Sequence, residues 1–121
     1  MAKGDDIEER LIKFAVRIIK VADKLPKTPA GRHIADQLLR AGTAPAFHYG
    51  EGRSAESKRD FAHKLRVALK EMNETRICLL MIIMSELLPE ALLADLLKKC
   101  IELCKILQTS IRTAQGSSRP T

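Results

Sequence analysis

The feature that most constrains this chain is a long apolar stripe within residues 53–88, a segment that contains neither glycine nor proline. Large apolar side chains and two small ones recur there at alternating spacings of four and three residues, at Phe61, Leu65, Ala68, Met72, Thr75, Leu79 and Ile82. This alternation places the members of the stripe on one face of an α-helix. The segment therefore predicts a helix over residues 55–86 that buries this face against other helices.

Three other segments have the same helical periodicity, and Pro26, Gly52 and Pro89 stand between neighbouring segments. Proline ends the helical ladder and glycine is a poor helix former. The pattern predicts four helices, over residues 6–24, 30–51, 55–86 and 90–113. Because the links are short, we expect an all-α, antiparallel up-down-up-down four-helix bundle. The length of 121 residues suits a single domain, residues 1–121, in which the polar residues 115–121 form a disordered tail.

Capping residues and one proline set the details of these helices. We expect Asp5 or Asp6 to cap the first helix, and Ser54 or Ser57 to cap the third. Pro45 lies within the second helix and lacks the N–H group that the helical ladder requires. We therefore expect the second helix to be bent or broken there, with a kink near Pro45.

Some apolar side chains lie outside the stripes that form the core. On the first helix Ile12, Val16 and Ile19 widen the apolar face beyond what a lone bundle can bury. The second half of the third helix, from Ile77 to Met84, is apolar nearly all round. A helix of this kind is covered on more than one side, so we expect neighbouring subunits to cover these side chains.

The overall charge and the cysteines bear on partners and environment. The formal net charge of +6 attracts anions, although many nucleic-acid-binding domains of this length carry more. Cys78, Cys100 and Cys104 lie in apolar helical segments, where free thiols in a reducing cytoplasm are expected. The residues after Met1 are acidic and unlike a signal peptide, and no apolar run reaches the length of a membrane span. We therefore expect a cytoplasmic protein without membrane contact.

Two basic stripes are the candidate binding surfaces, one on each of the helices predicted over residues 6–24 and 55–86. They comprise Arg10, Lys13, Arg17, Lys20 and Lys24 on the first, and Arg59, His63, Arg66 and Lys70 with Arg53 and Lys58 on the second. Such rows of cations can contact successive phosphates of RNA or DNA, or can form the solvated outer face of a bundle. Nearby Phe47 and Tyr49 are expected to be buried, so base stacking is not predicted.

A group of polar side chains surrounds the predicted kink. We interpret Arg40, Glu51 and Glu74 as structural polar residues, with Glu71 and Thr75 close to them. Glu51 is expected to accept hydrogen bonds from Arg40 or from backbone amides freed at the kink. The alternative is acid–base catalysis by Glu51 and Glu74, but no third residue is available to orient that pair.

Neither a cofactor nor a metal site is predicted. His33, His48 and His63 follow one another at intervals of 15 residues, so no two of them share a helical turn. Cys100 and Cys104 are one turn apart but belong to the core stripe, which favours packed thiols over a redox or metal role. Because the chain also lacks a phosphate-binding loop and a nucleophile motif, we expect that it is not an enzyme.

The segment from Gln37 to Leu88 carries a more specific pattern. Its residues are Gln37, Leu38, Arg40, Gly42, Thr43, Pro45, Ala46, Tyr49, Glu51, Ser54, Ser57, Lys58, Asp60, Phe61, Lys64, Leu69, Lys70, Glu71, Glu74 and Thr75. This pattern resembles that of bacterial four-helix-bundle proteins related to the 23S rRNA intervening-sequence protein. That family includes the accessory variability determinant of diversity-generating retroelements. His48 stands where the family often has asparagine, and Cys78 lies near a position that is often aromatic.

The resemblance implies a ring-shaped homopentamer with a basic surface. It also implies contact with nucleic acid and with a protein partner such as a reverse transcriptase. The leading hypothesis is therefore a non-enzymatic oligomeric module that contacts the phosphates of RNA or DNA through basic helix faces. The alternative is a protein–protein adaptor or scaffold with no nucleic-acid role, docking through exposed apolar side chains of the first or third helix.

Overall fold

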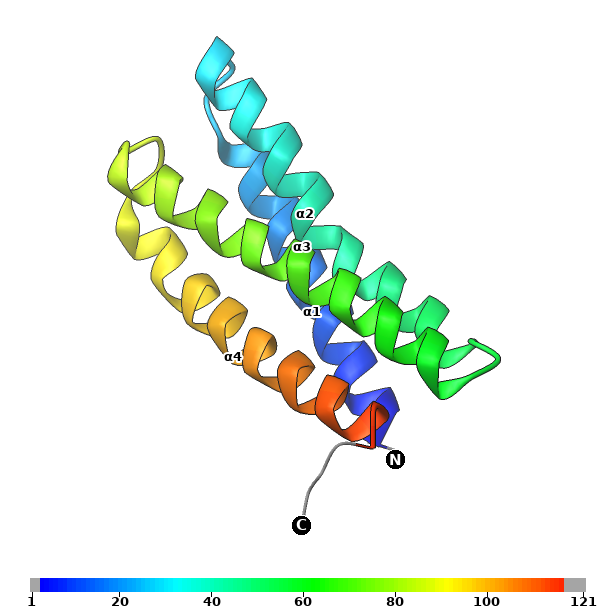
Figure 1. The fold of residues 1–121 in the computed structure, drawn as a ribbon. Coiled ribbons are helices and arrows are strands. Elements are labelled where there is room, and N and C mark those ends of the chain that lie inside the picture. Colours follow the sequence, from blue (N-terminus) through cyan, green and yellow to red (C-terminus); the bar gives the residue numbers. More distant parts are fainter. Residues whose placement is uncertain (1–2, 117–121) are drawn as a thin grey trace.

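The computed structural model describes residues 3–116, and this part of the chain folds as an antiparallel up-down-up-down bundle of four helices (Figure 1). The helices are α1 (Lys3–Lys24), α2 (Pro29–Arg53), α3 (Lys58–Met84) and α4 (Glu90–Ala114). The predicted all-α fold and the predicted order of helices are confirmed. Most of the polar tail predicted over residues 115–121 lies outside the described residues.

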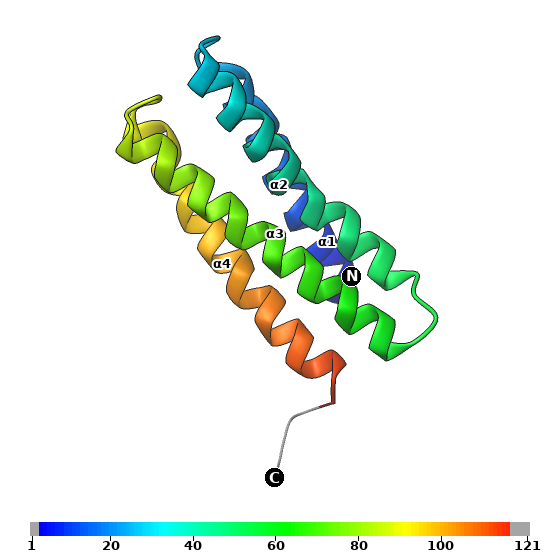
Figure 2. The same ribbon diagram turned by 45° about the horizontal axis from the view of Figure 1, so that its top comes forward.

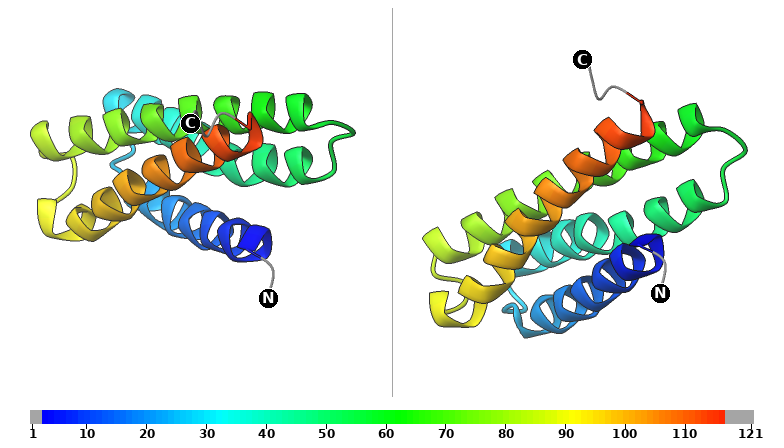
Figure 3. Two further views of the ribbon diagram at one scale, coloured as in Figure 1. Left: turned by 60° about the horizontal axis from the view of Figure 1, so that its bottom comes forward. Right: turned by 90° about the horizontal axis from the view of Figure 1, so that it is seen from below.

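The four helices form two antiparallel pairs, α1 with α2 and α3 with α4 (Figure 2). The pairs join mainly through α2 and α3, whereas the contact between α1 and α4 is the smallest between neighbouring helices. The two further views show that α1 and α4 move apart toward the ends of the chain marked N and C (Figure 3). As a result, one side of the bundle is closed by few contacts.

The core of the bundle is the stripe on α3 that the sequence predicts. Leu65, Met72 and Leu79 are fully buried, and they pack with buried side chains from the other three helices. Burying a side chain of this size stabilises the fold by about 1.5–3 kcal/mol. The same periodicity that predicts the helix therefore also identifies the face that holds the bundle together.

The helix ends confirm some predicted caps and correct others. The side chain of Ser57 accepts a hydrogen bond from the Asp60 N–H at 3.0 Å, so α3 begins at Lys58 rather than at residue 55. The predicted cap of α1 is wrong, because the helix already includes Lys3 and places Asp5 and Asp6 in its first turn. Carboxylates there still favour the helix through its dipole.

Pro45 lies in the interior of α2, which runs without a break from Pro29 to Arg53. The sequence predicts that Pro45 bends or breaks the helix, and the continuous α2 excludes a break. Pro45 is fully buried, so its ring contributes apolar packing where its missing N–H removes a backbone hydrogen bond. Two residues earlier, the Thr43 hydroxyl donates a hydrogen bond of 2.7 Å to the Leu39 carbonyl.

Within residues 3–116, each helix is too short or too polar to cross a lipid bilayer.

Candidate nucleic-acid interface

Three cationic side chains and one histidine form an exposed row on the outer face of α3. We refer to Arg59, His63, Arg66 and Lys70 as the α3 basic stripe; all four are exposed. Their spacings of four, three and four residues turn them to the same side of the helix, away from the core. Among the described residues, none of the four has an ion-pair partner. Their charges are therefore available to an anionic ligand.

Lys58 extends the α3 basic stripe at the start of the helix. It is exposed and, within the described part of the chain, also forms no ion pair. Lys58, Arg59 and Arg66 border a hollow of about 400 Å³ beside the last turn of α4. Three cations around one hollow raise the local positive potential, which strengthens attraction for phosphate.

Three of the five residues of the basic stripe predicted on α1 form ion pairs with acidic side chains. Arg10 lies 3.6 Å from Glu102, and Arg17 donates a hydrogen bond of 2.8 Å to Asp95, so both arginines link α1 to α4. Lys13 pairs with Glu9 at 3.1 Å on its own helix. Acids on α1 and α4 therefore compete with phosphate for these three residues, and their binding role stays a prediction.

Lys20 and Lys24 are the two remaining members of the row on α1. They are exposed, and no ion pair to either exists within residues 3–116. They lie at the opposite end of the bundle from Lys58, since α1 ends where α3 ends. These two lysines are consequently isolated from the α3 basic stripe.

Arg53 points to α1 rather than joining the α3 basic stripe. Its guanidinium donates to Glu8 at 2.8 Å and lies 2.7 Å from the Asp5 carboxylate. The hydrogen bonds to Asp5 and then Glu8 raise the pKa of Arg53. The two carboxylates give Arg53 a role in joining α2 to α1, and its predicted phosphate-binding role stays a prediction.

Arg40 lies at the centre of a polar cluster that joins α2 to α3, as predicted. It donates hydrogen bonds to Glu74 at 2.8 Å, to Glu71 at 3.0 Å and to Gln37 at 3.1 Å. The bond from Arg40 lowers the pKa of Glu74, and the two acceptors raise the pKa of Arg40. Glu71 is buried, and its backbone carbonyl accepts a bond of 2.9 Å from the Thr75 hydroxyl.

Glu51 has a different partner from the one that the sequence predicts. It accepts a hydrogen bond of 2.9 Å from Lys64, which lowers the pKa of Glu51, and its Oε1 lies 3.6 Å from Nδ1 of His48. Arg40 lies three helical turns away along α2 and meets α3 at Glu74. The predicted bond from Arg40 to Glu51 is therefore wrong, and the proposed acid–base pair of Glu51 and Glu74 is separated along the hairpin.

The two aromatic side chains of α2 have opposite environments. Tyr49 is buried as expected, but Phe47 is 69% exposed, so the prediction that both are buried is wrong. Position 47 lies on the outward face of α2, half a turn from the buried face of Tyr49. The sequence contains the signal for this, because Phe47 falls outside the spacing of three, four and four residues that connects Leu38, Ala41, Pro45 and Tyr49.

The described histidines and cysteines do not gather into a metal site. Within residues 3–116, no three side chains of the His, Cys, Asp or Glu type stand close enough together to hold a metal ion. Cys78, Cys100 and Cys104 are free and buried, and burial raises the pKa of the Cys78 thiol. A protonated, buried thiol is a poor nucleophile.

Comparison with known proteins places this geometry in context. Residues 5–109 match the sequence pattern of the family described as 23S rRNA-intervening sequence protein. A crystal structure of a protein of unknown function from the S23 ribosomal protein family of Bacteroides thetaiotaomicron is similar, with 30% sequence identity and a TM-score of 0.83. The similarity covers 88% of this chain and 98% of that chain. No functionally curated protein matches the chain.

Proposed function

The chain belongs to the 23S rRNA-intervening sequence protein family, and from this premise we propose that it is a non-enzymatic, oligomeric binding module. In this proposal the module contacts the phosphates of RNA or DNA through the α3 basic stripe and acts in the cytoplasm. The family description names an RNA sequence and the related crystal structure carries a ribosomal family name. Both make nucleic acid a natural ligand class.

The observation that carries the proposal is the contrast between paired and unpaired cations. Arg10, Arg17 and Arg53 are held by carboxylates of neighbouring helices, whereas the α3 basic stripe is exposed and without ion pairs among the described residues. From Arg59 to Lys70 the stripe spans about 16 Å of helix axis. A row of that length can contact several phosphates in succession, each contact releasing counterions.

Recognition by such a row is electrostatic and poor in sequence discrimination. The α3 basic stripe contains no Phe, Tyr or Trp, so phosphates rather than bases are the main groups that we expect it to contact. Exposed Phe47 is a possible stacking platform, but it lies on α2. We therefore expect binding to many sequences with similar affinity.

Oligomerisation is supported by apolar side chains that the single chain leaves exposed. On α1 they are Ile12, Val16 and Ile19, which are each more than 40% exposed, and on α3 they include Met81 and Met84. These are the side chains for which the sequence predicts a covering subunit. A homopentamer, as the family resemblance implies, would combine five copies of the +6 chain into a total charge of about +30 and add avidity.

Binding of a short fluorescent single-stranded RNA over a range of salt concentrations tests the proposal. The affinity should fall as salt rises, with a linear dependence of the logarithm of the binding constant on the logarithm of salt. Binding that is undetectable at low salt, or that does not change with salt, would contradict it.

A second candidate function is a protein–protein adaptor, and one observation favours it. The outer face of α3 changes from basic residues in its first half to Ile77, Met81 and Met84 in its second half, with Met84 83% exposed. Methionine-rich faces suit adaptable protein contacts. A protein partner such as a reverse transcriptase would bind here, and loss of that partner in a Met81→Glu, Met84→Glu variant with intact RNA binding would separate the two functions.

A further inference from the structure

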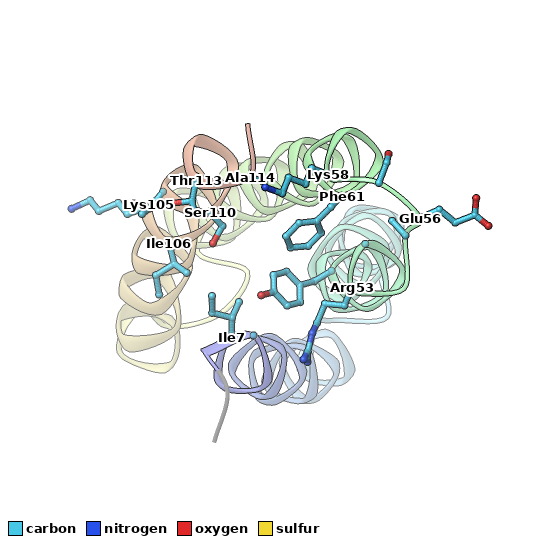
Figure 4. Close-up of a pocket in the computed structure, with 16 residues that line it drawn as sticks. Ile7, Arg53, Glu56, Lys58, Phe61, Lys105, Ile106, Ser110, Thr113 and Ala114 are labelled. Carbon is cyan, nitrogen blue, oxygen red and sulfur yellow. The ribbon is translucent and has the colours of Figure 1, made fainter. Parts of the chain in front are cut away.

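A cavity of about 810 Å³ opens where the start of α1, the end of α2, the start of α3 and the end of α4 meet (Figure 4). Its walls combine large apolar side chains with small residues that leave room between them. They include Ile7, Phe61 and Ile106, with Gly52, Ala55 and Ala114. A volume of this size is typical of small-molecule sites.

The arrangement of the helices explains why this end of the bundle is hollow. α1 and α4 make the smallest contact between neighbouring helices, and their two ion pairs, from Arg10 and Arg17, lie further along α1 than the residues that line the cavity. At the cavity itself, Ile7 of α1 lies across from Ile106 and Ser110 of α4 (Figure 4). The gap is therefore a consequence of the fold and needs no distortion to form.

Tyr49 contributes a hydroxyl group to the wall of the cavity. The residue is only 3% exposed, and its hydroxyl makes no hydrogen bond to any described residue. Its ring packs edge to face against Phe61, with centroids 6.0 Å apart. Burial raises the pKa of Tyr49, so the hydroxyl keeps its proton and can donate. An acceptor atom of a ligand in the cavity can therefore take this hydrogen bond in place of water.

Other polar side chains around the cavity differ in direction. In Figure 4 the Ser110 hydroxyl points into the cavity, and Lys58 extends along the rim toward the end of α4. Lys105 and Glu56 also line the cavity but point outward from it. Arg53 is held by Asp5 and Glu8. The unpaired charge directed at the opening is therefore the ammonium group of Lys58.

We propose that this cavity is a binding site for a small apolar carboxylate, such as a medium-chain fatty acid. The hydrocarbon part fills the space between Ile7, Phe61 and Ile106. The carboxylate accepts hydrogen bonds from Tyr49 or Ser110 and is attracted by Lys58. A cationic ligand is disfavoured by the ammonium group of Lys58, and a pure hydrocarbon offers no acceptor to Tyr49. The site shares Lys58 with the extended α3 basic stripe, but its other lining residues lie outside that stripe.

Isothermal titration of the full chain with octanoate, octylamine and 1-octanol tests this proposal. Octanoate should bind most tightly of the three, because only it has the charge that Lys58 attracts. Tyr49→Phe removes one hydroxyl and preserves the ring, and should weaken octanoate about fivefold. Lys58→Ala should weaken it by a similar factor, whereas the matched control Lys105→Ala should leave it unchanged.

Either of two results would overturn the proposal as a whole, and a third would contradict the role of Lys58. One is the absence of heat from octanoate up to millimolar concentration in a chain that is fully folded by circular dichroism. The other is binding that survives unchanged in both Tyr49→Phe and Ser110→Phe, since the larger ring at position 110 fills the cavity. Equal weakening by Lys58→Ala and Lys105→Ala would also contradict the assignment, because it would indicate a general effect of charge.

Discussion

Gly42 of α2 packs so closely on Ile18 of α1 that a Cβ atom at position 42 would lie 2.6 Å from the Cγ2 atom of Ile18. Ile18 is fully buried, and its branched side chain has few alternative rotamers. Gly42→Ala should therefore destabilise the fold by about 1–3 kcal/mol through overpacking. Urea unfolding of the purified protein measures this change.

Gly50→Ala is the matched control for that prediction. Both glycines lie inside α2, but a Cβ atom at position 50 meets only the Glu8 carboxylate, at an ordinary 3.5 Å. Alanine there should be neutral or stabilising by about 0.4–1 kcal/mol, because it restricts the unfolded chain. If both substitutions have the same effect, the close contact of α1 and α2 at Gly42 is not as described.

Arg40→Met should destabilise the protein more than the matched surface change Arg59→Met. Arg40 satisfies Glu71, whose side chain is only 11% exposed, and its loss leaves that carboxylate buried without its partner. We expect a cost of about 1–3 kcal/mol. Arg59 is exposed and has no ion pair among the described residues, so its replacement should stay within about 0.5 kcal/mol. Equal losses in urea unfolding would contradict this account of Arg40.

The stability of the protein should fall as pH falls below the ordinary glutamate pKa of about 4.3. The hydrogen bond from Arg40 lowers the pKa of Glu74 in the folded state, so the folded state binds fewer protons there than the unfolded state. This contribution is present above the unfolded pKa and is lost as pH falls through the lower, folded pKa. Glu74→Gln should therefore show a shallower acid loss than the wild type when urea midpoints are measured from pH 6 to pH 3.

Ile12→Glu combined with Val16→Glu should reduce the proposed oligomer to smaller species. Both side chains are exposed on α1, at 49% and 43%, so the single chain has no structural need for them. Carboxylates in an apolar subunit interface would be desolvated without partners. Light scattering should show a lower mass, while circular dichroism shows the same helix content. A wild-type monomer would contradict the oligomer outright.

The sequence predicts the bundle well because the apolar residues that repeat with helical spacing are also the residues that the bundle buries. Leu65, Met72 and Leu79 have helical spacing and are fully buried, and the pattern requires no knowledge of neighbouring helices. Lateral contacts are different. Whether Arg10 or Arg53 forms an ion pair depends on which acids lie on the adjacent helix. Arg10 meets Glu102 and Arg53 meets Asp5 only because of the order of the helices around the bundle.

The same limit explains the remaining corrections to the candidate site. Glu51 and Arg40 both belong to the predicted polar group. The register of α2 against α3 pairs Glu51 with Lys64 and Arg40 with Glu74. That register is a property of the packed hairpin and not of either helix. The cavity beside Tyr49 is likewise invisible in the sequence, because it results from the small contact between α1 and α4.

The salt dependence of RNA binding in two triple variants tests the central claim most directly. Arg59→Ala, Arg66→Ala, Lys70→Ala removes three cations of the α3 basic stripe. Lys20→Ala, Lys24→Ala, Lys27→Ala removes three exposed cations that also lack ion pairs within residues 3–116. We predict that the first variant weakens binding and reduces the slope of log K against log salt by at least about 2, and that the second nearly retains both. Equal losses in the two variants, or a larger loss in the second, would contradict the assignment of the interface to α3.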